Sequence, residues 1–219
     1  MSFDQQIKDQ YSRRGHKNTL YNSVYSILAD IEKLAALKSL LKEFLKIDQS
    51  TTIFEIGAGQ GGNIPVFHEL GFSNSSIFIN ELLPERIELA RLHHPDVKIY
   101  EGNILDIELT AQFDVVFQST VFTSVLSDND RKAIADKMWS LVKPGGIILW
   151  YDFVYNNPSN PDVKKVDQAE ACWLFSKAIK RKIVKVTLAP PIGRRVGKLY
   201  NLFNFPFLRS HILGVFQKQ

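Results

Sequence analysis

The spacing of apolar positions along the chain changes close to residue 47. Over residues 19–46, apolar residues recur at three- and four-residue steps on a background of lysine, glutamate and alanine. This spacing predicts one long amphipathic helix. From residue 51 onward, short apolar runs alternate with segments of helical periodicity. The apolar runs predict five strands, at residues 51–57, 75–80, 97–100, 113–118 and 145–153.

Three helices are predicted between these strands, over residues 63–71, 84–94 and 127–142. Pro84 suits the first turn of the second helix, and Ser127 is a suitable N-cap for the third. Strands that alternate with helices are typical of parallel βαβ units with right-handed crossovers. The sequence therefore predicts an α/β fold with a doubly wound, mostly parallel sheet.

The C-terminal part of the chain departs from this alternation. Residues 182–188 and 211–216 both have the composition of strands, and the stretch between them is too long for a bare loop in a compact domain. We expect a short helix over residues 194–203 in that stretch. The chain contains no internal repeat and no linker rich in proline, glycine or serine, so a single domain is expected.

The overall composition indicates a soluble globular protein. Hydrophobic residues make up 45% and charged residues 23% of the chain, and no apolar run approaches the length of a membrane span. The N-terminus lacks the apolar stretch of a signal peptide, so we expect a cytoplasmic protein. The single cysteine, Cys172, excludes an internal disulfide, and no Cys/His spacing indicates a metal site.

Charge is distributed unevenly. The chain has a net charge of +4, yet residues 171–219 contain ten basic residues and neither aspartate nor glutamate. A basic C-terminal part could attract an anionic partner, nucleic acid included. A solvated positive face is the alternative interpretation.

The loop after the first predicted strand, "FEIGAGQGGN", fits two glycine patterns. Gly57, Gly59 and Gly62 fit the G-x-G-x-x-G of a dinucleotide-binding turn. Glu55 with Gly57, Gly59 and Gly61 fits an acid-x-G-x-G-x-G turn that binds S-adenosylmethionine. In both cases glycines allow a sharp turn, and the following helix directs N–H groups at an anion.

Two acidic residues bear on this choice. Glu55 ends the first strand, where its carboxylate would repel a pyrophosphate but would favour an ammonium or sulfonium group. Glu81 ends the second strand, where the ribose of either cofactor would need an acceptor. Glu55 therefore favours the methyl donor, whereas Glu81 supports any nucleoside.

Further motifs follow in order: "VKIYEGNILDI", "FDVVFQSTVFTSVL" and "LVKPGGIILWYDF". With the glycine loop and Glu81, they resemble the class I S-adenosylmethionine-dependent methyltransferases over about residues 51–153. The resemblance implies a Rossmann-like sheet of seven strands with an antiparallel last strand. It also implies a helical N-terminal cap (1–47), a cofactor-binding core (48–155) and a substrate-side segment with the C-terminal strands (156–219).

The resemblance also implies roles for individual residues. Glu55 would contact the methionine end of the cofactor, Glu81 the ribose hydroxyls, and Asn103 the adenine amino group, although the family usually has aspartate there. Gln118 and Ser119 would face the methionine moiety. The implied cofactor site comprises Glu55, Gly57, Ala58, Gly59, Gly61, Glu81, Leu82, Asn103, Ile104, Gln118 and Ser119.

The segments "LWYDFVYNNPSNPDV", "VTLAPPIGRRV" and "LRSHILGVFQK" resemble a bacterial methyltransferase subgroup associated with polysaccharide or lipopolysaccharide biosynthesis. This favours O-methylation of a small-molecule acceptor, such as an anionic sugar or a lipid-linked saccharide. A hydroxyl acceptor needs a base within hydrogen-bond reach. Asp152 and His16 are the candidates, whereas His211 at the start of the last strand is more readily structural.

Three other functions remain as alternatives. A nicotinamide-dependent oxidoreductase is disfavoured by Glu55 and by the absence of a Tyr-x-x-x-Lys pair. A nucleic-acid methyltransferase or RNA-binding protein would use the basic C-terminal part, but "QSTV" stands where an N/D-P-P-Y/F motif would follow the fourth strand. A degenerate, non-catalytic fold is disfavoured by the intact glycine turn.

Overall fold

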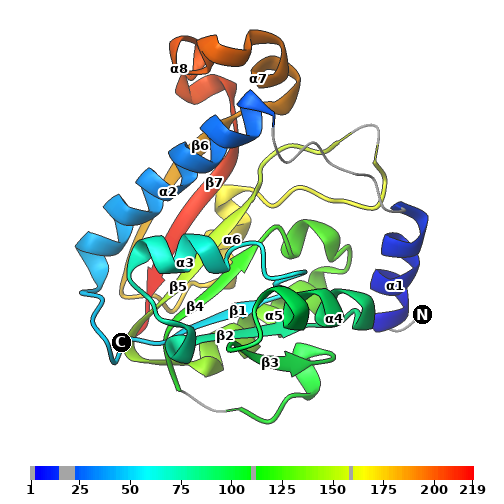
Figure 1. Ribbon diagram of the computed structural model, residues 1–219, viewed down its shortest axis with the longest axis vertical. Coiled ribbons are helices and arrows are strands. Elements are labelled where there is room, and N and C mark those ends of the chain that lie inside the picture. The colour runs from blue at the N-terminus through cyan, green and yellow to red at the C-terminus, as the bar shows by residue number, and fades with distance from the viewer. Residues whose placement is uncertain (1–2, 15–22, 110–111, 158–159) are drawn as a thin grey trace.

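The computed structural model describes residues 3–14, 23–109, 112–157 and 160–219. Its centre is a seven-stranded sheet of order β3-β2-β1-β4-β5-β7-β6 (Figure 1). β7 runs antiparallel to both β5 and β6, while the pairs among β1 to β5 are parallel. The predicted doubly wound sheet with an antiparallel last strand is confirmed. The strands are β1 Ile53–Ile56, β2 Ile77–Glu81, β3 Lys98–Glu101, β4 Phe113–Ser119, β5 Val142–Phe153, β6 Lys180–Leu188 and β7 Arg209–Gln217.

Helices cover both faces of the sheet (Figure 1). The α-helices are α1 Phe3–Arg14, α2 Val24–Phe44, α3 Ile64–Leu70, α4 Pro84–His93, α5 Asp128–Leu141, α6 Gln168–Leu174, α7 Pro190–Val196 and α8 Tyr200–Phe203. Single 3₁₀ turns are η1 Asn74–Ser76, η2 Ile104–Asp106, η3 Phe122–Ser124, η4 Gly197–Leu199 and η5 Pro206–Leu208.

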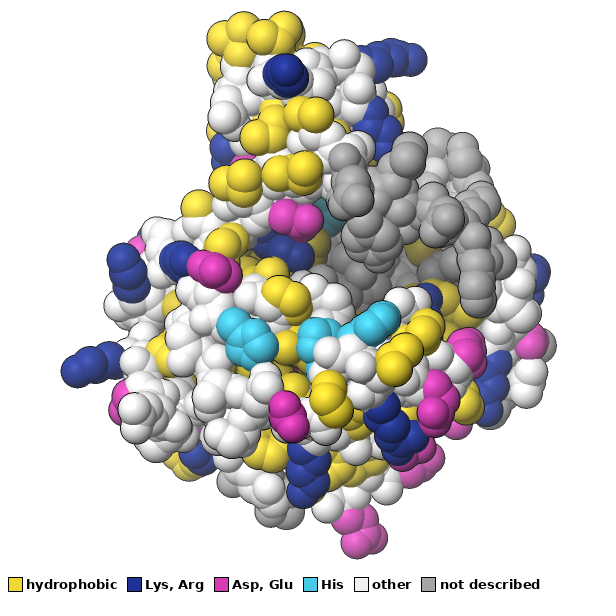
Figure 2. All heavy atoms as spheres, in the orientation of Figure 1, with side chains coloured by type: hydrophobic (Ala, Val, Ile, Leu, Met, Phe, Trp, Pro, Cys, Tyr) yellow, Lys and Arg dark blue, Asp and Glu magenta, His cyan; other side chains and the backbone are white. Residues whose placement is uncertain are grey.

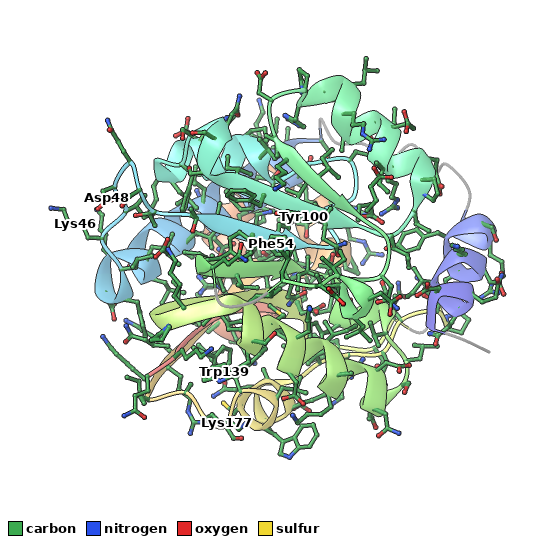
Figure 3. The ribbon with its side chains drawn as sticks, turned by 90° about the horizontal axis from the view of Figure 1, so that it is seen from below. Lys46, Asp48, Phe54, Tyr100, Trp139 and Lys177 are labelled. Carbon is green, nitrogen blue, oxygen red and sulfur yellow. The ribbon has the colours of Figure 1, made fainter. Side chains whose placement is uncertain are left out.

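Two hydrophobic clusters, one on each face, hold these layers together. Leu37, Phe67 and other apolar residues of α2 and α3 pack on one face against the inward side chains of β1, β4 and β5. On the other face, Ile134 and Leu174 of α5 and α6 pack with Phe54 and Trp150. Figure 3 shows Phe54 beside Tyr100, where the two ring centroids are 5.6 Å apart. Burial on both sides explains why the central strands are continuously apolar.

Local signals in the sequence account for several element ends. Ser127 accepts a hydrogen bond from the Asp130 N–H and caps α5, and Gly71 ends α3 in the left-handed conformation. Residues 143–146 form an irregularity inside β5, because Val142 pairs with Phe113 whereas Ile147 pairs with Val115.

Some elements differ from the sequence prediction. α6 was not expected. α1 lies within the helical N-terminal cap (1–47) that the resemblance implied, although the apolar spacing predicted no separate helix there. The single helix predicted over residues 194–203 is instead α7, η4 and α8. Residues 19–22, at the start of the long predicted helix, lie outside the described residues, and α2 begins at Val24. α1 has few apolar residues and α6 is short, so neither has enough periodic positions to be recognised.

The buried Arg131 on α5 connects the loop after β4 to the segment that precedes α6. Its Nε donates to the Phe122 and Val125 carbonyls at 3.1 and 2.7 Å. Its remaining nitrogens donate to the Lys164 and Lys165 carbonyls and to the Glu170 carboxylate. One guanidinium therefore satisfies backbone groups of two loops near the carboxyl ends of the strands.

Candidate functional site

The glycine loop joins β1 to α3 through a series of left-handed residues. Gly57, Gly59 and Gly61 have φ values of 64°, 60° and 81°, whereas Gly62 has no positive φ. The conformation therefore requires glycine at the three positions of the acid-x-G-x-G-x-G pattern. Gly62, the third glycine of the dinucleotide pattern, is not required for its backbone angle.

Neighbouring side chains also crowd two of these glycines. A Cβ atom at Gly57 would lie 2.7 Å from a methyl group of Val121, which follows β4. A Cβ atom at Gly61 would lie 2.8 Å from Ile64 of α3 and 2.7 Å from His94. The loop backbone is thus held close against the elements around it.

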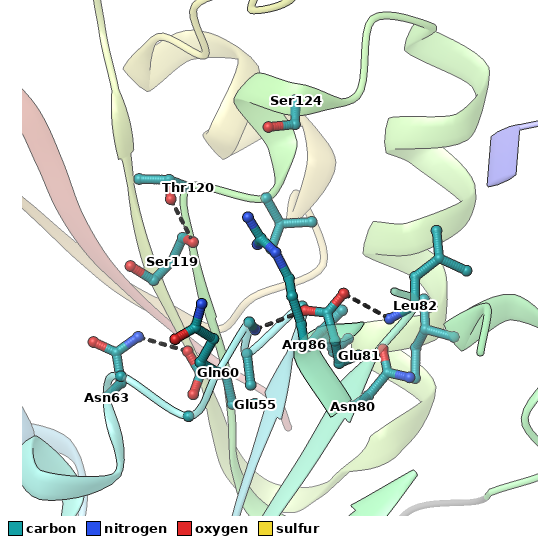
Figure 4. Close-up of a pocket in the computed structure, with 18 of the residues that line it drawn as sticks. Glu55, Gln60, Asn63, Asn80, Glu81, Leu82, Arg86, Ser119, Thr120 and Ser124 are labelled. Carbon is teal, nitrogen blue, oxygen red and sulfur yellow. Dashed lines mark hydrogen bonds between the residues drawn. The ribbon is translucent and has the colours of Figure 1, made fainter. Parts of the chain in front are cut away.

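Glu81, at the end of β2, fixes the glycine loop from the side. Its Oε2 accepts a hydrogen bond from the Gly59 N–H at 2.7 Å (Figure 4). Its Oε1 accepts from the N–H groups of Leu82 and Leu83 at 2.8 and 2.9 Å. Three N–H donors hold the carboxylate at the pocket wall and fix its orientation.

Glu55 lies at the end of β1 and is only 1% exposed. Its Oε1 accepts from the Asn63 amide at 2.6 Å, whereas Oε2 has no hydrogen-bond partner among the described residues (Figure 4). Burial raises the pKa of the Glu55 carboxyl to about 7, although Asn63 and Lys33 oppose that shift. Glu55 therefore presents a buried, under-satisfied acid to the pocket.

Lys33 reaches the same end of the pocket from α2. Its side chain is 12% exposed, and its Nζ donates to the Asn63 side-chain oxygen at 3.2 Å. The Asp30 carboxylate is 3.9 Å away. Burial lowers the Lys33 pKa, and the charges of Asp30 and Glu55 oppose this effect. Asn63 thus bridges the acid and the base through its two amide atoms.

These groups line one cavity of about 780 Å³ at the carboxyl ends of β1, β2 and β4. This is the position where open α/β sheets bind ligands. Ten of the eleven cofactor residues predicted from sequence line it: Glu55, Gly57, Ala58, Gly59, Gly61, Glu81, Leu82, Asn103, Ile104 and Ser119. The apolar part of the wall is formed by Leu82, Ile104, Val125 and Ile134.

Gln118 is the predicted cofactor residue that does not line the cavity. It is fully buried, its Nε2 donates to the Tyr151 carbonyl, and its Oε1 accepts from the Val121 N–H. Gln118 thereby positions the turn after β4. Asn103 lines the cavity, but its side-chain oxygen accepts from the Leu105 N–H and caps η2.

The predicted bases lie outside the cavity wall or outside the described residues. Asp152 is fully buried beyond Trp150, on the sheet face covered by α5, and is not among the lining residues. Burial raises its pKa to about 7 against hydrogen bonds from Thr123 and Phe153. His16 lies outside the described residues. The buried His211 stacks on Tyr151, and burial lowers its pKa to about 3.

Sequence reasoning missed several residues of the cavity wall. Asp30 and Lys33 come from α2, and Ile7 comes from α1. Tyr11 of α1, which the sequence had offered as a residue that lines the site, also lies in the wall. The Arg86 guanidinium lies 4.0 Å from the centre of the Tyr11 ring. Asn63, another residue of the wall, could have been found from the sequence because it directly follows the glycine turn. Asp30, Lys33 and Ile7 reach the cavity through contacts between elements that are distant in sequence.

The wall suits a nucleoside that carries an amino-acid group. Glu55, whose Oε2 has no partner among the described residues, lies with Lys33 at one end of the cavity. Glu81 lies on the next strand of the sheet, and Asn103 and Ile104 follow the strand beyond it. A zwitterionic end would complement Glu55 and Lys33, and a flat base would pack against the apolar wall. The described residues contain no group of His, Cys, Asp and Glu that could hold a metal ion.

Comparison with known proteins supports this assignment. Residues 53–146 match the family model of the methyltransferase domain. A protein-L-isoaspartate O-methyltransferase from Methanococcoides burtonii is 40% identical over 53 residues, which are 24% of this chain and 26% of that protein. The match therefore spans about a quarter of that relative's length.

Solved structures resemble the chain over a greater length. The N-methyltransferase NodS from Bradyrhizobium japonicum WM9, in complex with S-adenosyl-L-homocysteine, covers 100% of this chain and 99% of its own, with a TM-score of 0.69 and 12% identity. A SAM-dependent methyltransferase from Archaeoglobus fulgidus covers 89% of this chain and 99% of its own, with a TM-score of 0.60 and 13% identity. These likenesses confirm the predicted Rossmann-like fold of the chain.

Proposed function

We propose that this chain is an S-adenosylmethionine-dependent methyltransferase that methylates a hydroxyl group of a small molecule, a sugar or a glycoconjugate. The observation that carries the proposal is the arrangement of Glu55, the left-handed Gly57-Gly59-Gly61 turn and Glu81 around one cavity. The methyltransferase domain match over the same residues supports it.

In this proposal each part of the wall holds one part of the methyl donor. Glu55 and Lys33 hold the ammonium and carboxylate of the methionine end. Glu81 accepts from the ribose hydroxyls, and Ile104 and Leu82 enclose the adenine, whose amino group donates to Asn103. The left-handed glycines let the loop backbone pass close to the methionine end, and the Gly59 N–H is held by Glu81.

When bound, the donor supplies a methyl group on a positively charged sulfur. The protein then has to align an acceptor oxygen with that methyl group and exclude water. Ser119 at the end of β4, and Thr120 and Ser124 after it, line the cavity and are suited to orient a hydroxylated acceptor (Figure 4). Of the two bases predicted from the sequence, Asp152 is buried outside the cavity wall, and His16, which lies outside the described residues, stays a prediction.

Calorimetric titration with S-adenosylhomocysteine, and with NAD and NADP in parallel, tests the cofactor. We expect micromolar binding of the homocysteine nucleoside alone. At one hundred times the dissociation constant, it should stabilise the folded state by about 2.7 kcal/mol and raise the melting temperature by roughly 5–10 °C. Binding of a dinucleotide alone would make the chain an oxidoreductase and overturn the proposal.

Transfer of a labelled methyl group tests the acceptor. The full chain is incubated with labelled donor and, separately, with neutral sugars, uronic acids, lipid-linked saccharides and RNA. The proposal expects label in a saccharide as a base-stable ether. Label in RNA, or on the nitrogen of an amino sugar, would support methyl transfer but contradict a saccharide hydroxyl as the acceptor.

A further inference from the structure

The segment between β6 and β7, here called the C-terminal head, comprises residues 190–208 (α7, η4, α8 and η5). It projects beyond the sheet at the N-terminal end of α2 (Figure 1). Tyr200 anchors it: the hydroxyl donates to Glu32 of α2 at 2.6 Å and accepts from the Leu188 N–H at 2.9 Å. Gly193 lies against the Tyr25 ring, so closely that a Cβ atom would lie 2.2 Å from the ring.

The C-terminal head buries these anchors and exposes most of its large apolar side chains. Leu202 is 66% exposed and Phe207 is 71% exposed. The Phe205 and Phe207 rings stack on each other with centroids 5.7 Å apart and remain exposed. The exposed apolar residues of the head are Leu199, Leu202, Phe203, Phe205 and Phe207. Figure 2 shows hydrophobic side chains gathered at this end of the molecule.

Basic residues accompany this apolar surface. Arg194, Arg195 and Lys198 are exposed, and none of the ion pairs between described residues involves them. The sequence contains no aspartate or glutamate anywhere from residue 171 to residue 219. The C-terminal head therefore combines exposed aromatic and leucine side chains with a positive charge that its own segment does not neutralise.

We propose that the C-terminal head docks on the surface of an anionic lipid bilayer. Exposed Phe and Leu side chains can enter the headgroup region, while Arg and Lys contact lipid phosphates. No helix among the described residues is long and apolar enough to cross a bilayer, so the contact is peripheral. Five large apolar side chains exposed within one short segment are consistent with an interaction surface.

Charge distinguishes this partner from a second copy of the chain. A symmetric dimer through the C-terminal head would bring Arg194, Arg195 and Lys198 of one copy near the same residues of the other. Such like charges repel each other, whereas an anionic bilayer attracts all of them. The anchored head also packs on α2, so docking holds the α2 wall of the cavity, with Asp30 and Lys33, close to the lipid surface.

The test measures partition of the full chain into vesicles by sedimentation. Vesicles of phosphatidylcholine mixed with phosphatidylglycerol should retain the protein, and vesicles of phosphatidylcholine alone should not. L202S with F207S should weaken partition at least about tenfold. R194Q with R195Q and K198Q should weaken it about a hundredfold, or fivefold for each base.

Matched controls distinguish docking through the C-terminal head from nonspecific adsorption to vesicles. L92S removes an apolar side chain that is 75% exposed on α4, and K177Q with R181Q removes bases outside the head. Both controls should keep wild-type partition. Equal losses in the controls, or equal retention on neutral vesicles, would overturn the proposal. So would a dimer in light scattering that L202S with F207S converts to a monomer.

The vesicle assay needs neither methyl donor nor acceptor. Circular dichroism of each variant confirms that it is folded, and S-adenosylhomocysteine titration should give the wild-type constant, because none of these residues lines the cavity. Failure to partition with intact nucleoside binding rejects the docking surface alone. Partition without nucleoside binding rejects the proposed function alone.

Discussion

At the residue scale, the charges at one end of the cavity depend on one another. Glu55 is buried and Lys33 is largely shielded from solvent, and this environment alone would favour the neutral form of each. Asn63 hydrogen-bonds to both, with its amide nitrogen on the acid and its oxygen on the base. This arrangement keeps two opposite charges near each other without direct contact, which leaves each able to bind one charge of a zwitterion.

Substitution of Lys33 tests this arrangement. K33Q should weaken binding of S-adenosylhomocysteine by roughly tenfold or more, because a charge-assisted hydrogen bond to its carboxylate is lost. Binding of 5′-methylthioadenosine, which lacks the carboxylate, should change little. Calorimetry of both ligands gives the comparison.

K38Q is the matched control, since Lys38 lies on the same helix and pairs with Glu69 at the surface. It should bind both ligands as the wild type does. Equal weakening of both ligands by K33Q would assign Lys33 a structural role instead.

Asp152 makes the stability of the protein depend on pH. Its pKa is about 7 in the folded state, above its ordinary value near 3.8, so folding favours the protonated form. The stability associated with that proton is fully present below the ordinary pKa and is lost as the pH rises through 7. D152N should therefore gain melting temperature relative to the wild type as the pH rises from about 4 to about 7, and the difference should then level off.

Thermal denaturation at several pH values measures this difference. A constant difference between D152N and the wild type would contradict the burial argument. Once an acceptor is known, the turnover number of D152N tests the separate prediction that Asp152 is a base.

At the element scale, the strands and the glycine turn of the site could be predicted from short stretches of contiguous sequence. The alternation of apolar runs and helices predicted the first five strands, and Glu55 and Gly57 were recognisable because the motif is contiguous in sequence. Contacts between distant elements were not predictable. Asp30 and Lys33 reach the cavity only because α2 packs across the sheet. Asp152 shares its strand face with Trp150, but the sequence does not tell on which side the cavity opens.

Alanine substitutions in the glycine turn separate the two cofactor patterns. G61A forces a left-handed alanine against Ile64 and His94, and should cost about 1–3 kcal/mol of folding free energy and weaken S-adenosylhomocysteine binding. G62A meets no atom within 4 Å and should change the free energy by less than about 0.5 kcal/mol.

Urea denaturation and calorimetry measure both effects. If G62A proved more damaging than G61A, the dinucleotide pattern would describe the turn better than the methyl-donor pattern.

Arg131 is the side chain on which the loop after β4 depends most. R131M leaves four backbone carbonyls and the Glu170 carboxylate without their donor, and should cost about 3–5 kcal/mol in the free energy of unfolding. Urea denaturation measures the loss. R91M removes an exposed arginine and should stay within about 0.5 kcal/mol of the wild type.

At the scale of the whole molecule, one contiguous part of the chain, from β1 to β4, supplies most of the cavity wall, and the elements before and after it pack around this part. β1 to β4 supply the glycine turn, Glu81 and Asn103, while α1 and α2 close the cavity from the N-terminal side. The C-terminal head extends from the far edge of the sheet (Figure 1). The aromatic residues of the head do not follow the spacing of a helix or a strand, so the sequence could not show that they lie at the surface.

The position of β7 between β5 and β6 has a consequence for biosynthesis. β6 precedes β7 in the chain, yet β7 is its neighbour in the sheet and β5 does not pair with it. On a ribosome, β1 to β5 can assemble as soon as they emerge, but β6 has no partner until β7 is made. During that interval the edge of β5 and the basic β6 remain unpaired, and the positive charges of β6 oppose its association with other nascent chains.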